Sequence, residues 1–381
     1  MNHGSFGSCP VKVLEFQRGL RDRLERQPVK FFVRDLEGLV DEARAELAGF
    51  LGADPRDLVF VPNATTGINT VLRSLNFERG DELLVTNHEY NACRNALDFV
   101  AGRSGARVVV ATVPFPVRSE EEIVKAVLER VGRRTKVALI DHVTSQTGLI
   151  FPVERLVKEL QRRGVDALVD GAHAPGMIPL NLRQMGAAYY TGNCHKWLCA
   201  PKGAGFLCVR RDRQQRIRPL SISHGANSPR RDRSPFLIEF GWTGTWDPSA
   251  CLSVPVALRF MEGRLRGGWP AIMERNHALV LAARRILCGV LEIDPPCPDR
   301  FIGSLASVPI PDGKEGKPPS SPLYADPLQE RLLRKYGIEV PVIPWPAPPK
   351  RLLRISAQLY NSLPQYELLA EALKKTLRAG R

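Results

Sequence analysis

The amino-acid sequence predicts an α/β protein with a large, mainly parallel sheet flanked by helices, followed by a smaller C-terminal α+β domain. Between residues 58 and 170, short apolar runs alternate with amphipathic helical segments. Apolar strands that alternate with helices are typical of a parallel sheet covered on both faces. From about residue 249 the pattern changes to long helical stretches with few strand-like runs. The length of 381 residues also suits one large and one smaller domain.

Two amphipathic helices are expected before the sheet begins. The first covers residues 11–26 and ends before Pro28. The second begins at Asp35, whose carboxylate can cap the helix, and stops at Gly52.

The remaining elements follow in chain order. Strands are expected at 58–61, 82–86, 107–112, 136–141, 167–170 and 203–209. The helices between them begin near Thr66 and Asn91 or cover 119–131 and 152–163. Residues 215–248 are expected to be rich in loops, and residues 249–292 to be mainly helical. The last part is expected to hold a loop at 309–322, a helix at 324–336, strand-like runs at 338–343 and 351–355, and a helix at 364–378.

The composition argues against a membrane protein and a nucleic-acid-binding protein. No run approaches the roughly 18 uncharged apolar residues that a membrane span needs. The N-terminus lacks the basic and apolar regions of a secretory signal. The net charge is +14, yet the basic runs, such as residues 230–233, are short and broken by acids. Since no nucleic-acid-binding motif accompanies them, a basic pocket for an anionic ligand is the better interpretation.

The eight cysteines are scattered and predict no disulfide framework, so a cytoplasmic protein is expected. Cys194 and Cys199 flank His195, but this spacing does not fit a zinc site. No metal is expected.

Three polar segments are expected at the carboxyl ends of parallel strands, where open sheets bind ligands. Residues 63–67 open a helix, where backbone N–H groups can bind an anion or simply be capped by threonine. Asp170 ends an apolar strand and needs a cation or donor, such as a protonated pyridine nitrogen, unless it caps the next turn. Lys196 follows an apolar run among short polar residues. Burial there would lower its pKa and free its lone pair for a carbonyl, unless it extends to solvent beside Trp197.

Several short blocks identify a family resemblance over nearly the whole chain. They lie at residues 2–7, 63–66, 88–90, 142–149, 170–176, 195–198, 244–247 and 353–356. In these blocks the chain resembles the class V aminotransferase superfamily and, within it, the enzymes similar to isopenicillin N epimerase. The Asp-Gly-Ala-His-Ala-Pro-Gly block from Asp170 and the His-Lys-Trp block around Lys196 are specific for the superfamily, but they do not identify a substrate.

The resemblance implies a fold-type-I enzyme that uses pyridoxal 5′-phosphate (PLP) and has a mainly parallel, seven-stranded type of sheet. It implies an N-terminal segment and helix (1–30) that packs with the small domain, a large PLP-binding domain (31–250) and a small domain (251–381). The active enzyme is implied to be a homodimer with its active sites at the interface.

The same resemblance assigns three catalytic residues. Lys196 carries the cofactor as a Schiff base and moves the Cα proton of the substrate. Asp170 pairs with the pyridine nitrogen. Tyr90 stacks on the cofactor ring, with His88 as the alternative, and is also a candidate second acid.

Further residues are implied to bind the cofactor or the substrate. Ser145 and His173 would face the phenol oxygen of the cofactor, and Thr245 would reach the phosphate from the neighbouring subunit. The remaining phosphate contacts would come from Ala64, Thr65, Thr66, Asn193 and His195. Arg354 would bind the substrate carboxylate, with its planar fork suited to a bidentate pair, although by itself it resembles a surface arginine of a strand. The other candidate substrate contacts are Asn2, His3 and His224.

The resemblance leaves the reaction open among several outcomes. We expect Lys196 to remove the Cα proton of an amino acid, and epimerisation to follow. C–S lyase activity by β-elimination and transamination are the alternatives within the enzyme class, and a degenerate binding module is the alternative outside it. Persulfide chemistry is disfavoured because residues 337–350 contain no cysteine.

Overall fold

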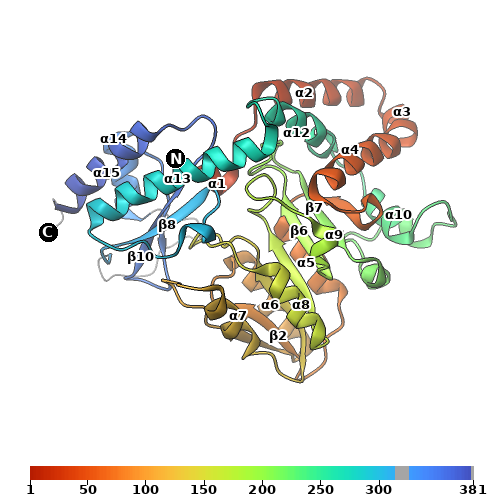
Figure 1. The fold of residues 1–381 in the computed structure, drawn as a ribbon. Helices are drawn as coiled ribbons and strands as arrows, with labels where there is room; N and C mark the ends of the chain where they lie inside the picture. Colours follow the sequence, from red (N-terminus) through yellow and green to blue (C-terminus); the bar gives the residue numbers. More distant parts are fainter. Residues whose placement is uncertain (314–325, 379–381) are drawn as a thin grey trace.

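A seven-stranded sheet is the largest feature of the computed structural model, which describes residues 1–313 and 326–378 (Figure 1). The strands are β1 (Leu58–Val61), β2 (Glu82–Thr86), β3 (Arg107–Ala111), β4 (Thr135–Asp141), β5 (Asp166–Gly171), β6 (Tyr189–Asn193) and β7 (Gly205–Val209). Their order across the sheet is β1-β7-β6-β5-β4-β2-β3. Strand β7 runs antiparallel to both of its neighbours, whereas the other pairs are parallel. The mainly parallel sheet predicted from the sequence is therefore confirmed.

Alternate residues of the strands pack into two apolar layers, one on each face of the sheet. Leu83 and Val85 of β2 pack with α5 (Ala64–Ser74) and α6 (Asn91–Ser104), whereas Leu84 belongs to the opposite layer. The opposite layer is built from α4 (Leu36–Leu51), α7 (Glu120–Leu128), α8 (Val153–Arg162) and α12 (Val254–Glu262). Because both faces are covered, the strands can be apolar at nearly every position.

A second, three-stranded sheet forms the core of the C-terminal part (Figure 1). Its antiparallel strands lie in the order β8 (Leu305–Ile310), β10 (Arg351–Ser356), β9 (Val342–Pro344). The helices around it are α13 (Gly268–Leu291), α14 (Pro327–Tyr336) and α15 (Leu363–Arg378). A smaller α+β unit was expected here, and the domain limits at residues 30 and 250 stay predictions.

The N-terminal helices differ from the expectation at Pro28 and Asp35. The chain stays helical from α2 (Val11–Arg26) through α3 (Pro28–Lys30) and a π-helical turn (Phe31–Asp35) into α4. Pro28 is tolerated because it occupies the first turn of α3, where its missing N–H would have no partner in the helix. The Asp35 carboxylate does not cap α4 but lies 2.6 Å from both Lys30 Nζ and Arg23 Nη2.

Further differences concern β8, β9 and the segment before α11 (Ser249–Leu252). Strand β8 was not predicted, and its last two residues fall where the loop at 309–322 was expected. Pro309 is tolerated in the strand because β8 is an edge strand. The predicted loop at 309–322 lies largely outside the described residues. Strand β9 begins near the end of the run predicted at 338–343. The segment 215–248 contains one short α-helix, α10 (Pro235–Gly241), and a 3-10 turn (His224–Asn227). Within residues 1–313 and 326–378, no helix is both long and apolar enough to cross a membrane.

Gly67 allows helix α5 to lie directly against strand β6. A Cβ atom at this position would lie within 2.8 Å of Thr191 Cβ, which is closer than two carbon atoms can approach. Thr191 is itself held by a hydrogen bond of 2.7 Å from its hydroxyl to the Phe206 carbonyl oxygen. The N-terminus of α5 is therefore set close to the strand that precedes Lys196.

We expect Gly67→Ala to lower the free energy of unfolding by about 1–3 kcal/mol, because the new methyl group overfills a packed site. The matched control is Gly102→Ala in the neighbouring helix α6, where a Cβ atom meets nothing within 4 Å. That change should stabilise the protein by about 0.5–1 kcal/mol, since alanine favours a helix over glycine. Urea unfolding followed by circular dichroism checks both variants. Equal midpoints for the two variants would contradict the close contact.

Candidate active site

The site begins where β4, β5 and β6 end at one edge of the large sheet. In the parallel register, Asp141 of β4 is paired with Asp170 of β5, and Asp170 is paired with Thr191 of β6. The loop that follows β6 carries Lys196. Asp170 and Lys196 therefore meet at the same edge, as their positions in the sequence predicted.

Lys196 is half-buried, and its amine contacts a histidine. Its Nζ lies 3.0 Å from His173 Nε2, while Trp197 Nε1–H is directed at His173 Nδ1 at 3.4 Å. With Nδ1 accepting, the neutral imidazole carries its proton on Nε2 and presents it to the lone pair of an uncharged amine. Burial lowers the pKa of Lys196 to about 8, and the nearby Asp170 opposes that shift in part. Burial has the larger effect, so a larger share of the amine is neutral and nucleophilic near pH 7 than for an ordinary lysine.

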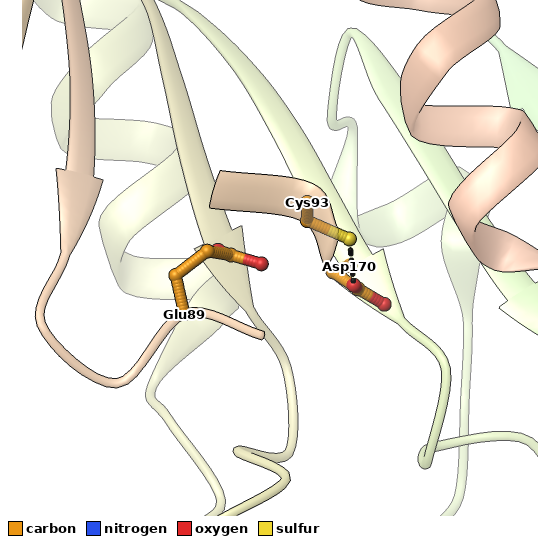
Figure 2. Close-up of side chains that lie close together, drawn as sticks. All are labelled: Glu89, Cys93 and Asp170. Carbon is orange, nitrogen blue, oxygen red and sulfur yellow. Dashed lines mark hydrogen bonds between the residues drawn. The ribbon is translucent and has the colours of Figure 1, made fainter. Parts of the chain in front are cut away.

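Asp170 is held by two donors. Its Oδ1 accepts the Ala172 backbone N–H at 2.8 Å, and its Oδ2 accepts the Cys93 thiol at 3.2 Å (Figure 2). Burial raises the pKa of Asp170, whereas these two donors and the charge of Lys196 favour the ionised form. A buried carboxylate with fixed donors on both oxygens can still accept a proton or N–H group from a ligand.

Two further acids lie beside Asp170 and were not predicted from the sequence. Glu89 follows β2 and points toward Cys93 and Asp170 in Figure 2, and Asp141 ends β4. Glu89 Oε2 and Asp141 Oδ2 are buried, and neither receives a hydrogen bond from a donor in the described parts of the chain. Burial, together with the negative charge of the neighbouring acids, raises the pKa of both carboxyls well above the usual range. A proton shared between the two would satisfy both oxygens.

The acids also define the one group of possible metal ligands found among the described residues. Ligand atoms of Glu89, Cys93 and Asp170 lie within 4.8 Å of one another. A metal needs deprotonated ligands, but burial raises the pKa of all three groups. This electrostatic environment favours protons over a cation.

An anion-binding cradle lies at the N-terminus of α5. Asn63 caps the helix through its Oδ1, which accepts the Thr66 N–H at 2.9 Å, and Asn193 Oδ1 accepts the Ala64 N–H at 2.9 Å. No acceptor for the Thr65 N–H is found among the described residues. His195 Nδ1 is also buried without a partner in this part of the structure, and burial lowers the pKa of its ring to about 4. The free N–H of Thr65 and the unpaired nitrogen of His195 suit a phosphate group.

Arg354 reaches the site from strand β10 of the small sheet. Its Nη1 donates to the Ser145 carbonyl oxygen at 2.6 Å and to the Ser145 hydroxyl at 3.2 Å. Its Nη2 donates to the Ser5 hydroxyl at 2.8 Å. Burial lowers the pKa of Arg354 to about 10, so the guanidinium remains charged at neutral pH. The hydroxyl of Ser145, predicted to face the cofactor, here contacts the arginine.

The aromatic candidates occupy different environments. Tyr90 is 41% exposed, and the charges of Asp170 and Arg354 act on its pKa, which burial raises. His88 is fully buried, and its ring nitrogens contact the Thr147 hydroxyl at 2.8 Å and the Val113 carbonyl oxygen at 3.0 Å. These partners favour Tyr90 over His88 as the group that meets the cofactor ring.

The remaining candidates are divided between the Lys196 region and the surface. His3 contacts the Lys196 carbonyl oxygen at 3.0 Å and the Tyr360 hydroxyl at 2.7 Å, and Asn2 accepts a hydrogen bond from Ser5. Thr245 is exposed. His224 lines a cavity of about 400 Å³ that the Lys196 group does not line. Within the one described chain, His224 is therefore not brought to the site.

The residues together fit PLP. A lysine with a lowered pKa, an aspartate with free acceptor capacity and an anion cradle match the aldehyde, the pyridine nitrogen and the phosphate of that molecule. The buried Nδ1 of His195 and the N–H of Thr65 would receive partners from the phosphate. Glu89, Cys93 and Asp141 surround Asp170 and were not predicted from the sequence. Asp141 could have been found there because, like Asp170, it ends an apolar strand.

Comparisons with known proteins agree with this fit. The sequence profile of the aminotransferase class-V family matches residues 29–237. An isopenicillin N epimerase of Amycolatopsis lactamdurans is 35% identical, with 98% of this chain and 94% of that protein covered. A probable chloroplastic L-cysteine desulfhydrase of Arabidopsis thaliana is 33% identical, with coverage of 100% and 83%.

The structures of the cystine C–S lyase C-DES are similar in fold. One, a complex with cysteine persulfide, has a TM-score of 0.78 at 21% identity, with 98% of this chain and 96% of that chain covered. These likenesses and the geometry of the site lead to one conclusion: the chain belongs to the class V aminotransferase family of PLP-dependent enzymes.

Proposed function

We propose that this enzyme cleaves the C–S bond of a sulfur-containing amino acid by β-elimination, with Lys196 as the base that removes the Cα proton. The observation that supports this choice is that, among the described residues around Asp170, Lys196 is the one base that is neither engaged through ring nitrogens nor assigned to the cofactor phosphate. His3 and His88 have both ring nitrogens engaged, and His173 faces Lys196 itself. A β-elimination needs only one group that accepts and returns a proton, whereas epimerisation needs a second group on the opposite face of the substrate.

The proposed roles of the residues follow from their positions. The cofactor, when bound, withdraws electrons from the substrate Cα and weakens its bonds. Asp170 would hold the pyridine nitrogen, and Thr65, Asn193 and His195 would hold the phosphate. Arg354 would orient the substrate through its carboxylate. Tyr90 would cover the cofactor ring.

Lys196 would carry out both proton transfers of the elimination. Its neutral amine accepts the Cα proton, and the ammonium formed can donate that proton to the sulfur as the Cβ–S bond breaks. One water then completes the reaction, so that the thioether or thiol amino acid yields pyruvate, ammonia and a free thiol. His173 keeps the amine in place throughout because its Nε2 faces Nζ at 3.0 Å.

Epimerisation, the outcome expected from the sequence, remains the second candidate. Relatives with either activity in their names match the whole chain at similar identity, so the comparisons do not single out the epimerase. An epimerase needs an acid on the side opposite to Lys196. The hydroxyl of Tyr90 has no hydrogen-bond partner among the described residues, and its raised pKa keeps it protonated as such an acid must be.

The assembly and location of the enzyme also belong to the proposal. We infer a homodimer, because the exposed Thr245 would then reach the cofactor phosphate of the neighbouring subunit. A cytoplasmic location is consistent with eight cysteines that are all free.

The elimination predicts defined products from L-cysteine and L-cystine. Enzyme with PLP in D₂O should release pyruvate and ammonia in equal amounts, together with sulfide or persulfide. Lactate dehydrogenase coupling measures the pyruvate, and Lys196→Ala should release none above background. Recovery of deuterated D-amino acid without pyruvate from every sulfur amino acid tested would instead establish epimerisation.

Tyr90→Phe distinguishes the two reactions by a second route. If Tyr90 only covers the ring, phenylalanine retains the stacking, and pyruvate release should fall less than about threefold. If Tyr90 is the opposite-face acid, the loss of general-acid catalysis should slow inversion about 10²–10⁴-fold. Chiral chromatography of the recovered amino acid provides the measurement.

The lowered pKa of Lys196 predicts how the apoprotein captures PLP. Only the neutral amine attacks the aldehyde, so the capture rate should rise about tenfold between pH 6 and 7 and level off above pH 8. Stopped-flow absorbance measures the rate, and Nα-acetyl-lysine run in parallel corrects for the titration of PLP itself. A rate that still rises steeply from pH 9 to 10 would show an ordinary lysine pKa. Lys196→Ala should show no covalent capture.

A further inference from the structure

The first residues of the chain form a short segment, residues 2–7, that touches both catalytic elements of the site. Its helical part, α1 (His3–Phe6), lies beside β10 (Figure 1). His3 Nε2 lies 3.0 Å from the Lys196 carbonyl oxygen, and the Gly4 N–H donates to Ser356 Oγ at 3.1 Å. Ser356 lies two residues after Arg354 on the same strand, so both side chains lie on one face of it.

Close contacts leave little room for this segment to move. A Cβ atom at Gly4 would lie 2.7 Å from Leu305 Cδ1. A Cβ atom at Gly7 would lie 2.8 Å from the Lys196 carbonyl oxygen, and Gly7 also has a φ of +70°, which favours glycine. The segment is therefore packed between the lysine loop and the small sheet.

Within this segment, Ser5 connects to Arg354 through a directional chain of hydrogen bonds. The Ser5 hydroxyl donates its only hydrogen to Asn2 Oδ1 at 2.6 Å and accepts from Arg354 Nη2 at 2.8 Å. On the other side of the guanidinium, Nη1 donates to Ser145. The guanidinium is thus held at two points that come from segments far apart in the sequence.

These two contacts leave part of the arginine free. A guanidinium has five N–H donors, and Ser5 takes one of the two on Nη2. The second Nη2 hydrogen and the Nε–H have no acceptor among the described residues. Two free donors on a fixed plane are what a carboxylate needs for a bidentate pair.

We propose that Ser5, itself held by Asn2, is a positioning residue that fixes the Arg354 guanidinium for the substrate carboxylate. Ser5 acts through Arg354 and does not itself contact the substrate. The segment 2–7 sets the distance between the carboxylate site on β10 and the amine of Lys196, because it is bound to both. The inference rests on the proposed function only in taking Arg354 as the carboxylate-binding residue.

The test compares ligands with and without a carboxylate on the PLP-loaded enzyme. In Ser5→Ala, the dissociation constant of L-alanine should rise about tenfold, which is typical for the loss of one hydrogen bond to a charged group. Binding of ethylamine, which lacks the carboxylate, should change less than twofold. Both titrations use the absorbance of the bound cofactor. Ser5→Thr, which keeps the hydroxyl, should restore L-alanine binding.

The matched control is Ser362→Ala, an exposed serine that precedes α15 in the same C-terminal part of the chain. It should leave both dissociation constants unchanged. If Ser5→Ala weakens ethylamine as much as L-alanine, the serine has only a general structural role and the inference is overturned. Equal L-alanine binding by Ser5→Ala and the unmodified enzyme overturns it as well.

A second measurement separates this inference from the proposed function. Phenylglyoxal modifies accessible arginines, and peptide mass spectrometry can follow its reaction with Arg354 in the apoprotein. Loss of the Ser5 contact should raise that rate several-fold in Ser5→Ala and leave it unchanged in Ser362→Ala. If no amino acid changes the cofactor absorbance of the unmodified enzyme, the proposed function fails. The role of Ser5 is rejected only if Arg354 reacts with phenylglyoxal at the same rate in Ser5→Ala as in the unmodified enzyme.

Discussion

The in-register ends of β4, β5 and β6 are the constraint on which the rest of the site depends. Parallel strands that end together bring their last residues to one edge, and here those residues include Asp141 and Asp170. Two buried acids paired in register repel each other, and Glu89 adds a third. The fold tolerates this concentration of carboxyls only because protons, the Cys93 thiol and the Lys196 amine are also present. The electrostatics of the site thus follow directly from the strand register.

The same balance explains why Lys196 and Arg354 differ in their chemistry although desolvation acts on both. Burial shifts both pKa values downward, but arginine starts from a much higher value and keeps its charge. Lys196 becomes an amine that can lose its proton close to neutral pH, with His173 in contact on one side. The site therefore separates a permanent cation, suited to a carboxylate, from a nearby base that can gain and lose a proton.

The sequence predicted the large sheet, the Asp170–Lys196 pair and the arginine better than it predicted their surroundings. Strand identities followed from periodicity, and short blocks spread over nearly the whole chain identified the family. Cys93 and Glu89 could not be found in this way, because a cysteine on an amphipathic helix and a glutamate in a loop have no distinctive pattern. His224 and Thr245 stay predictions, since a single chain does not bring them to Lys196. Asp35 was assigned as a cap from its type alone, and two nearby cations outcompete the helix for it.

The choice between elimination and inversion must therefore depend on groups outside the shared cofactor cradle. Relatives with either name match this chain almost end to end at 33% and 35% identity. In the proposed roles, Lys196, Asp170 and the α5 N-terminus would serve the steps that the two reactions share, so none of them would decide the outcome. The groups proposed to approach the substrate from other directions are Tyr90 on the exposed side and Arg354, whose guanidinium Ser5 and Ser145 hold. A rotation of the carboxylate turns a different Cα or Cβ bond into the reactive orientation, which makes the arginine and its partners as important to the reaction as the lysine.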